Sequence, residues 1–213
     1  MNLRPLGYEP SELPDCSTPH DDASKGRRKL PTLARHRMTN ASRGYGARMT
    51  IRSAYPTWPT YNQRLVDVVA NMTEEQLAVQ PAPDRWPIWA TIGHAACQRV
   101  FWLCDFAGES GAETTPFTNA AFDCPGDDDL DHPLDAPALV EALASTFHIV
   151  EHCLDDWTID MLDEEIRRRW GDEERVHNRG WVLERVFAHD VYHCAELNET
   201  LGTVGLPQID LWS

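Results

Sequence analysis

The chain has 213 residues, of which 42% are hydrophobic and eight are tryptophan, so it is long and apolar enough for one packed domain with an extension. No apolar run approaches the about 18 residues of a transmembrane helix, and the first residues lack the pattern of a signal peptide, so no membrane partner is expected. The formal net charge is −15, and residues 53–213 hold 29 acidic against nine basic residues, which disfavours nucleic acid as a partner.

The first segment differs in composition from the rest. Residues 1–49 are rich in Pro, Ser, Arg and Gly and lack a sustained apolar period, so we predict a disordered, basic N-terminal extension. The basic run 25-KGRRK-29 is interpreted as part of a solvated tail. The folded domain is predicted over residues 50–213.

Apolar residues then recur at three- and four-residue steps, which predicts an all-α fold. Thr73 and Gln76 have the spacing of a capping box that starts a short helical turn. Pro87 suits the first position of a helix, and Gly202 suits the residue after one. Four long helices are predicted at about 58–72, 87–106, 136–157 and 179–202.

The connections between these helices predict their arrangement. Residues 107–134 form a long polar crossover between the second and third helices. Gly171 and Asp172 lie in the middle of the segment 163–178, which predicts a small hairpin before the fourth helix. The apolar tail 206–213 is expected to dock on the body. A four-helix bundle is the architecture that these features favour.

The six cysteines include no CxxC pair and no short-loop framework. Reduced thiols in a cytoplasmic protein are therefore the expected state. Cys97 and Cys104, seven residues apart on the second helix, are interpreted as small core residues rather than redox partners.

Two pairs of histidines are spaced four residues apart, 148-HIVEH-152 and 189-HDVYH-193. Each pair places two imidazoles on one helical face, about 6 Å apart between Cβ atoms. On the third helix the pair lies opposite the apolar stripe, so His148 and His152 are interpreted as surface residues. That stripe consists of Leu139, Leu143, Phe147, Val150, Leu154 and Trp157.

On the fourth helix, His189 and His193 lie at the edge of the apolar face, about 60–100° from its centre. A catalytic metal needs such a place, enclosed enough to fix its ligands and open enough to keep one coordination position free. The alternative is a pair of ordinary half-buried histidines bonded to backbone or water. His94, at the border of the apolar face of the second helix, could converge with them on Zn²⁺, or on Ni²⁺ or Fe²⁺.

The stretches RWPIWATIGHAACQRVFW (85–102) and RGWVLERVFAHDVYHCAELNETLGTVGLPQIDLW (179–212) resemble the DinB-like superfamily of metalloenzymes. The resemblance spans about 50–213. It implies a four-helix bundle in which one histidine of the second helix and an HxxxH pair of the fourth coordinate a divalent metal. By motif match these are His94, His189 and His193. It does not imply DNA binding, and some relatives form homodimers, so a homodimer is an expected partner state.

Three functions are compatible with such a site. The first is a transferase or isomerase that uses a metal-activated low-molecular-weight thiol, as some relatives do, with Gln98 and Tyr192 orienting a small-molecule substrate. The second is metal-dependent hydrolysis of a small molecule. The third is a non-catalytic bundle that binds metal or ligand. Asp190 resembles the general base of HExxH enzymes, but it falls in the middle of the apolar face, so we expect a structural charge pair, with Arg99 as its partner.

Overall fold

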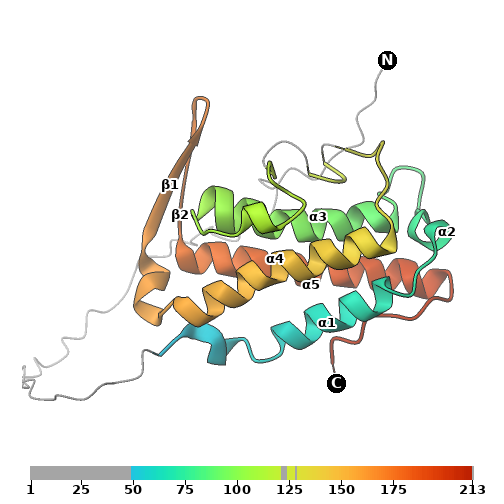
Figure 1. Ribbon diagram of the computed structural model, residues 1–213, viewed down its shortest axis with the longest axis horizontal. Helices are drawn as coiled ribbons and strands as arrows, with labels where there is room; N and C mark the ends of the chain where they lie inside the picture. Colours follow the sequence, from blue (N-terminus) through green and yellow to red (C-terminus); the bar gives the residue numbers. More distant parts are fainter. Residues whose placement is uncertain (1–48, 121–123, 128, 213) are drawn as a thin grey trace, which may run out of the picture. The chain divides into compact units, whose positions relative to one another are not determined.

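The computed structural model describes residues 49–120, 124–127 and 129–212. Of the extension predicted at 1–49, all but Met49 lies outside the described residues. The described chain is predominantly helical, with one small sheet (Figure 1). No helix among the described residues has the length and apolarity that crossing a membrane requires. Its elements are α1 (Trp58–Val69), α2 (Glu74–Leu77), α3 (Ile88–Val100), α4 (Ala136–Asp156), β1 (Glu165–Trp170), β2 (Glu173–Asn178) and α5 (Arg179–Thr203).

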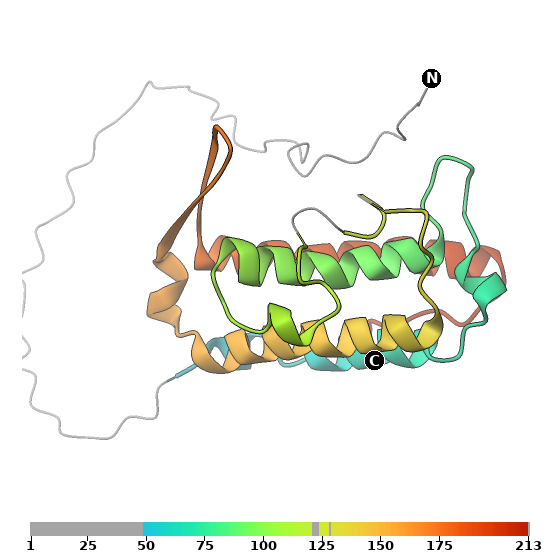
Figure 2. The same ribbon diagram turned by 45° about the horizontal axis from the view of Figure 1, so that its top comes forward.

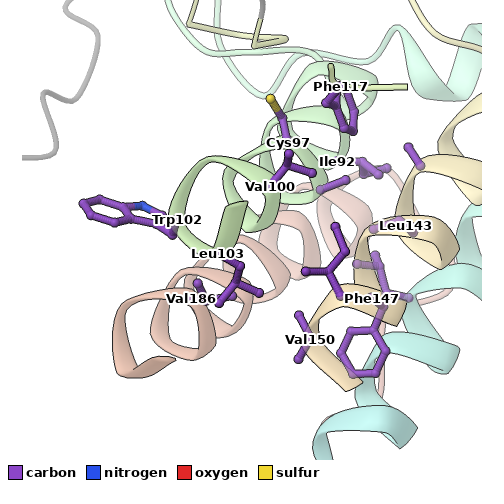
Figure 3. Packing of buried hydrophobic residues seen from close by; sticks show 14 of the residues in the cluster. Ile92, Cys97, Val100, Trp102, Leu103, Phe117, Leu143, Phe147, Val150 and Val186 are labelled. Atoms are coloured by element: carbon purple, nitrogen blue, oxygen red, sulfur yellow. The ribbon is translucent and has the colours of Figure 1, made fainter. Parts of the chain in front are cut away.

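The four long helices enclose a common core. Helix α3 packs against both α4 and α5, and α1 packs against α4. Figure 2 shows the connection between α3 and α4 passing over α3 before it reaches the start of α4. In Figure 3, Leu103 on the α3 side and Val186 on α5 lie close together, and Leu143 on α4 lies across the interior from them. All six residues of the stripe predicted for the third helix are buried, five on α4 and Trp157 as its C-cap residue: Leu139, Leu143, Phe147, Val150, Leu154 and Trp157.

The predicted helix starts are largely confirmed. The Thr73 side chain accepts a hydrogen bond from the Gln76 backbone, and the Gln76 side chain accepts one from the Thr73 backbone, which completes the capping box. Pro87 is the N-cap of α3 and not its first residue, since its ψ of 158° is extended. The predicted end at 106 is reached through a π-helix, Phe101–Phe106, which the apolar period does not distinguish from an α-helix.

The hairpin predicted within 163–178 is present. β1 and β2 pair antiparallel, with Glu165 opposite Asn178 and Trp170 opposite Glu173. Gly171, at φ +59°, supplies the left-handed backbone that a two-residue turn needs. The Trp170 ring stacks on Phe101 and Phe106 and so attaches the hairpin to the π-helix. The expectation of an all-α fold therefore needs correcting to a predominantly helical fold with a two-stranded sheet.

The end of α5 differs from the prediction. Gly202 remains helical, and Gly205 (φ +72°) is the residue after the cap. The Leu206 backbone N–H donates to the Leu201 carbonyl and Gly205 donates to Gly202, the two bonds of a Schellman motif. Beyond it the apolar tail docks as expected, because the Asn198 side chain bonds both the N–H and the carbonyl of the buried Ile209.

The N-terminus of α4 allows a direct test of helix capping. The Asp135 Oδ1 atom accepts the Ala138 backbone N–H at 2.9 Å. We expect Asp135→Ala to lower the free energy of unfolding by about 1 kcal/mol, measured by urea denaturation, because one helix-end N–H loses its partner. The control Asp131→Ala, which changes an exposed aspartate before the helix, is expected to stay within about 0.5 kcal/mol. Equal losses in both variants would contradict a capping role.

Candidate metal centre

Two helices bring three histidines together. His94 lies in the middle of α3, and His189 and His193 lie one turn apart on α5. Because α3 packs against α5, the His94 ring contacts both other rings, with centroids 5.0 and 5.1 Å away. All three side chains are buried, at 5–7% exposure. The edge position expected for the α5 pair is thus more enclosed than predicted, because α3 covers it.

The other HxxxH pair behaves as predicted. His148 and His152 on α4 are exposed, on the side opposite the core stripe. The His152 ring lies 3.3 Å from a carboxylate oxygen of Asp156 on the same helix. Identical spacing in the sequence therefore gives a surface pair on α4 and a buried pair on α5.

The three rings of the α3–α5 cluster point one nitrogen each toward a common centre. The His189 Nε2 atom lies 3.1 Å from the Nε2 atoms of both His94 and His193. The three ligand atoms, one from each residue, all lie within 4.8 Å of one another. Nitrogens bound to Zn²⁺ at about 2.0–2.1 Å are about 2.8–3.4 Å apart in geometries between octahedral and tetrahedral. The observed spacing fits a first-row divalent cation.

The opposite nitrogens of two of these rings contact carboxylates. The His94 Nδ1 atom lies 3.1 Å from Asp127 Oδ2, and the His193 Nδ1 atom lies 3.0 Å from Glu196 Oε2. Metal-binding histidines commonly donate their second N–H to a carboxylate, which fixes the tautomer and the ring orientation. The donor set therefore fits a metal in its chemistry as well as in its spacing.

These contacts also distribute the protons of the cluster. Burial lowers the pKa of His94, but its hydrogen bonds with Asp127 and Cys124 outweigh burial and raise the pKa to about 9. Burial and the neighbouring rings of His193 and His94 lower the pKa of His189 well below 6.5. Burial also lowers the pKa of His193, against the opposing effect of Glu196. These shifts favour a proton on His94 over one on His189 or His193.

The crossover loop forms one wall of the site. Pro125 packs closely on α3 at Gly93. A Cβ atom added to Gly93 would lie 3.0 Å from the Cβ atom of Pro125. Gly126 (φ +83°) lies under Trp86, where a Cβ atom would be 3.1 Å from the indole. The Trp86 ring in turn lies 4.8 Å from the His94 ring, centroid to centroid. Trp86 and this loop therefore help to shield His94 from solvent.

A second group of ligating side chains shares one histidine with the first. Among the described residues, His94, Cys124 and Asp127 also offer ligand atoms within 4.8 Å of one another. The Cys124 Sγ atom lies 3.8 Å from His94 Nδ1. This group would use the Nδ1 atom, whereas the three-histidine group uses the Nε2 atoms. Burial and the neighbouring Cys97 raise the pKa of the Cys124 thiol, which disfavours the thiolate that a metal binds.

Asp190 occupies the structural position expected for it. Its carboxylate is 7% exposed and accepts hydrogen bonds from Arg99 Nε at 3.0 Å and from Trp58 Nε1 at 2.9 Å. Arg99, only 2% exposed, also donates to Asn62 and to the Leu143 carbonyl. The predicted pairing with Arg99 is confirmed. Because these partners occupy the carboxylate, Asp190 is not placed as a general base.

The two residues predicted to orient a substrate lie beside the cluster. Gln98 is one turn after His94 and is buried, with its Nε2 atom 3.8 Å from Cys124 Sγ. Tyr192 is 53% exposed, and its ring lies 5.1 Å from that of His193. Both neighbour a proposed ligand, and their role in substrate binding stays a prediction. Asp127 and Glu196 were not predicted, although Glu196 has the i, i+3 spacing from His193 that could have indicated it.

A family model and two solved structures are similar to this chain. The model described as the DinB superfamily matches residues 60–197. The chain is similar to the crystal structure of a DinB-like protein from Bacillus cereus, with 16% identity, a TM-score of 0.54, and coverage of 76% of this chain and 98% of that one. It is also similar to a conserved protein from Enterococcus faecalis, with 18% identity, a TM-score of 0.52, and coverage of 71% and 95% respectively. Identities this low indicate a shared fold and carry no activity. No curated protein matches the chain.

Proposed function

Because this chain belongs to the DinB superfamily, we propose that it is a divalent-metal-dependent enzyme that uses a low-molecular-weight thiol in a transferase or isomerase reaction. His94, His189 and His193 hold the metal in this proposal, with Zn²⁺ preferred and Ni²⁺ or Fe²⁺ as alternatives. In this proposal the four long helices form the four-helix bundle of the family, with the crossover between α3 and α4. A small molecule is the substrate class, and a homodimer is the proposed assembly.

One observation carries the metal-dependent part of this proposal. Three buried imidazoles from two helices direct their Nε2 atoms at one another, at 3.1 Å for two of the pairs. Two of the rings keep the Nδ1 atom on a carboxylate, which leaves the Nε2 atom of each facing the shared centre. A bound metal would stabilise this convergence of the three rings. Without a metal the convergence is less favourable, because buried imidazoles that lie this close together cannot all be protonated.

The chemistry follows from a neutral ligand set. Three imidazoles leave the full divalent charge in place, so the bound cation would acidify a coordinated thiol or water. In a transfer, the thiol sulfur forms a bond to an electrophilic carbon, the leaving group departs with its electron pair, and the thiol proton passes to solvent. Trp86 limits the access of water to His94, and the exposed Tyr192 and buried Gln98 are the proposed contacts for the electrophile.

Hydrolysis of a small molecule is the weaker alternative. The HExxH-like reading of 189-HDVYH-193 needs Asp190 as a base, but this carboxylate is hydrogen-bonded to Arg99 and Trp58. Among the three ligands' described neighbours, Asp127 and Glu196 are engaged by His94 and His193. In the described part of the site, a hydrolase would therefore lack a carboxylate that is available to act as general base.

The proposed function predicts thiol-dependent turnover. We expect metal-loaded protein, purified without an affinity tag, to accelerate conjugation of monochlorobimane to bacillithiol, mycothiol or glutathione, read as an increase in fluorescence. The physical reason is that acidification raises the fraction of reactive thiolate at neutral pH. Chelator-treated protein is the control. No acceleration with any of the three thiols would contradict the thiol-dependent reaction, and no stoichiometric metal by elemental analysis would contradict a metal-dependent enzyme of any kind.

A further inference from the structure

We propose that Asp127 and Glu196 are positioning residues of this site, which hold the Nδ1 atoms of His94 and His193 so that the Nε2 atoms meet at the metal. The inference rests on the proposed function, since it assigns a role toward the metal. It adds to the three histidines two carboxylates from different parts of the chain, one in the crossover loop and one on α5.

The geometry of the two carboxylates is alike. Each has one oxygen within 3.1 Å of an Nδ1 atom, and each side chain is about one third exposed. A neutral imidazole whose Nδ1–H is donated to a carboxylate carries its lone pair on Nε2. Metal binding displaces the second proton of His94, and both rings then have the tautomer that a metal at the shared centre requires.

Asp127 depends on a loop that is fitted closely to α3. Pro125 covers Gly93, the residue before His94, and Gly126 lies against the Trp86 ring. A side chain at either glycine would meet these groups at 3.0–3.1 Å, and the φ of +83° at Gly126 disfavours other residues. These two glycines let the loop approach α3 closely enough for Asp127 to reach the Nδ1 atom.

Glu196 depends only on α5. It follows His193 by three residues, so the two side chains lie on one face of the same helix. Its Oε2 atom lies 3.0 Å from the His193 Nδ1 atom. This contact persists wherever α5 is intact, whereas the Asp127 contact needs the crossover loop in place.

A rival arrangement uses the same loop differently. If a metal bound to His94 Nδ1, Cys124 and Asp127, then Asp127 would be a ligand and not a positioning residue. The two arrangements differ in their dependence on His189 and in the presence of sulfur at the metal. Co²⁺ distinguishes them, because a thiolate ligand adds a sulfur-to-metal charge-transfer band in the near ultraviolet.

The test measures Zn²⁺ affinity by competition with a chromophoric chelator, together with Co²⁺ spectra and the melting temperature of the metal-free protein. We expect Asp127→Ala and Glu196→Ala each to weaken binding by about 10–100-fold, with the metal-free melting temperature little changed. Asp127→Asn, which keeps an oxygen acceptor for the Nδ1–H, is expected to lose less than Asp127→Ala. The wild-type Co²⁺ spectrum should lack a thiolate band.

Matched controls come from the same elements. Asp129 also contacts a histidine, the exposed His132, at 2.8 Å in the same connection, so Asp129→Ala should leave Zn²⁺ affinity unchanged. Glu199→Ala, an exposed position three residues after Glu196, should also leave it unchanged. Both controls remove a carboxylate of the same kind without touching the three rings.

The outcomes separate this inference from the proposed function. If His189→Ala abolishes binding while Asp127→Ala and Glu196→Ala bind as tightly as wild type, the positioning role is overturned and the metal site stands. If His189→Ala binds normally and Co²⁺ shows a thiolate band, the rival site is correct and both proposals are overturned. Equal losses in the Asp129→Ala control would likewise overturn the specific role of Asp127.

Discussion

Replacing His94 by alanine is expected to abolish stoichiometric binding of a divalent metal while leaving the fold nearly intact. His94 is the only ligand that α3 contributes to the three-histidine group, so the remaining pair on α5 would bind with two nitrogens. The loss of metal affinity should exceed the decrease of about 10–100-fold that is typical when a residue bonded to a metal ligand is removed. Elemental analysis after dialysis measures bound metal, and circular dichroism measures the retained helix.

The matched control for this experiment lies on α4. His148→Ala removes an exposed imidazole from the other HxxxH pair, and its metal content should equal that of wild type. Each variant loses one imidazole, so if metal bound nonspecifically to histidine side chains, the metal content of both variants would change alike. Unchanged metal in His94→Ala would remove the basis of every catalytic proposal made here.

Helix periodicity predicted more of the fold than of the site's surroundings. The α4 stripe and the capping box of Thr73 and Gln76 depend on residues three and four apart, where local spacing settles the structure. The π-helix at Phe101–Phe106 keeps the same apolar content as an α-helix, so no sequence period separated the two. Because glycine is favoured just after a helix, the sequence predicts the end of α5 at Gly202, yet Gly205, two residues before Pro207, forms the Schellman motif.

The candidate site likewise combines histidines that the sequence predicted with a carboxylate that it did not. His189 and His193 follow from a helical repeat, and His94 follows from its place on the apolar border of α3, supported by the family resemblance. Asp127 lies in a connection without any period, where no local rule relates it to His94, 33 positions earlier. Its contact arises from the packing of the crossover loop on α3, which is a tertiary event.

The buried pair of Arg99 and Asp190 connects the site to the core. Arg99 follows His94 by five residues on α3, and Asp190 directly follows His189 on α5. Their ion pair, at 2.9 Å between Arg99 Nη2 and Asp190 Oδ2, therefore joins the two ligand-bearing helices within about one turn of the metal ligands. Trp58 of α1 donates to the same carboxylate, so a third helix shares the contact.

Asp190→Ala is accordingly expected to lower the free energy of unfolding by about 3–5 kcal/mol, because Arg99 would stay buried without its counter-charge. Urea denaturation of the metal-free protein measures the loss. Asp190→Asn keeps an acceptor for Trp58 and should lose less. The surface control Glu173→Ala removes a partner of Arg175 in an exposed pair and should cost less than about 1 kcal/mol.

The double variant Arg99→Ala with Asp190→Ala decides whether the two residues act as a pair. Removing both charges leaves no uncompensated ion, so the double variant should be more stable than the two single losses added together predict. Metal affinity should fall in every variant that loses the pair, since α3 and α5 would no longer be joined beside their ligands. Additive losses, or a single variant as stable as wild type, would contradict the coupling between Arg99 and Asp190.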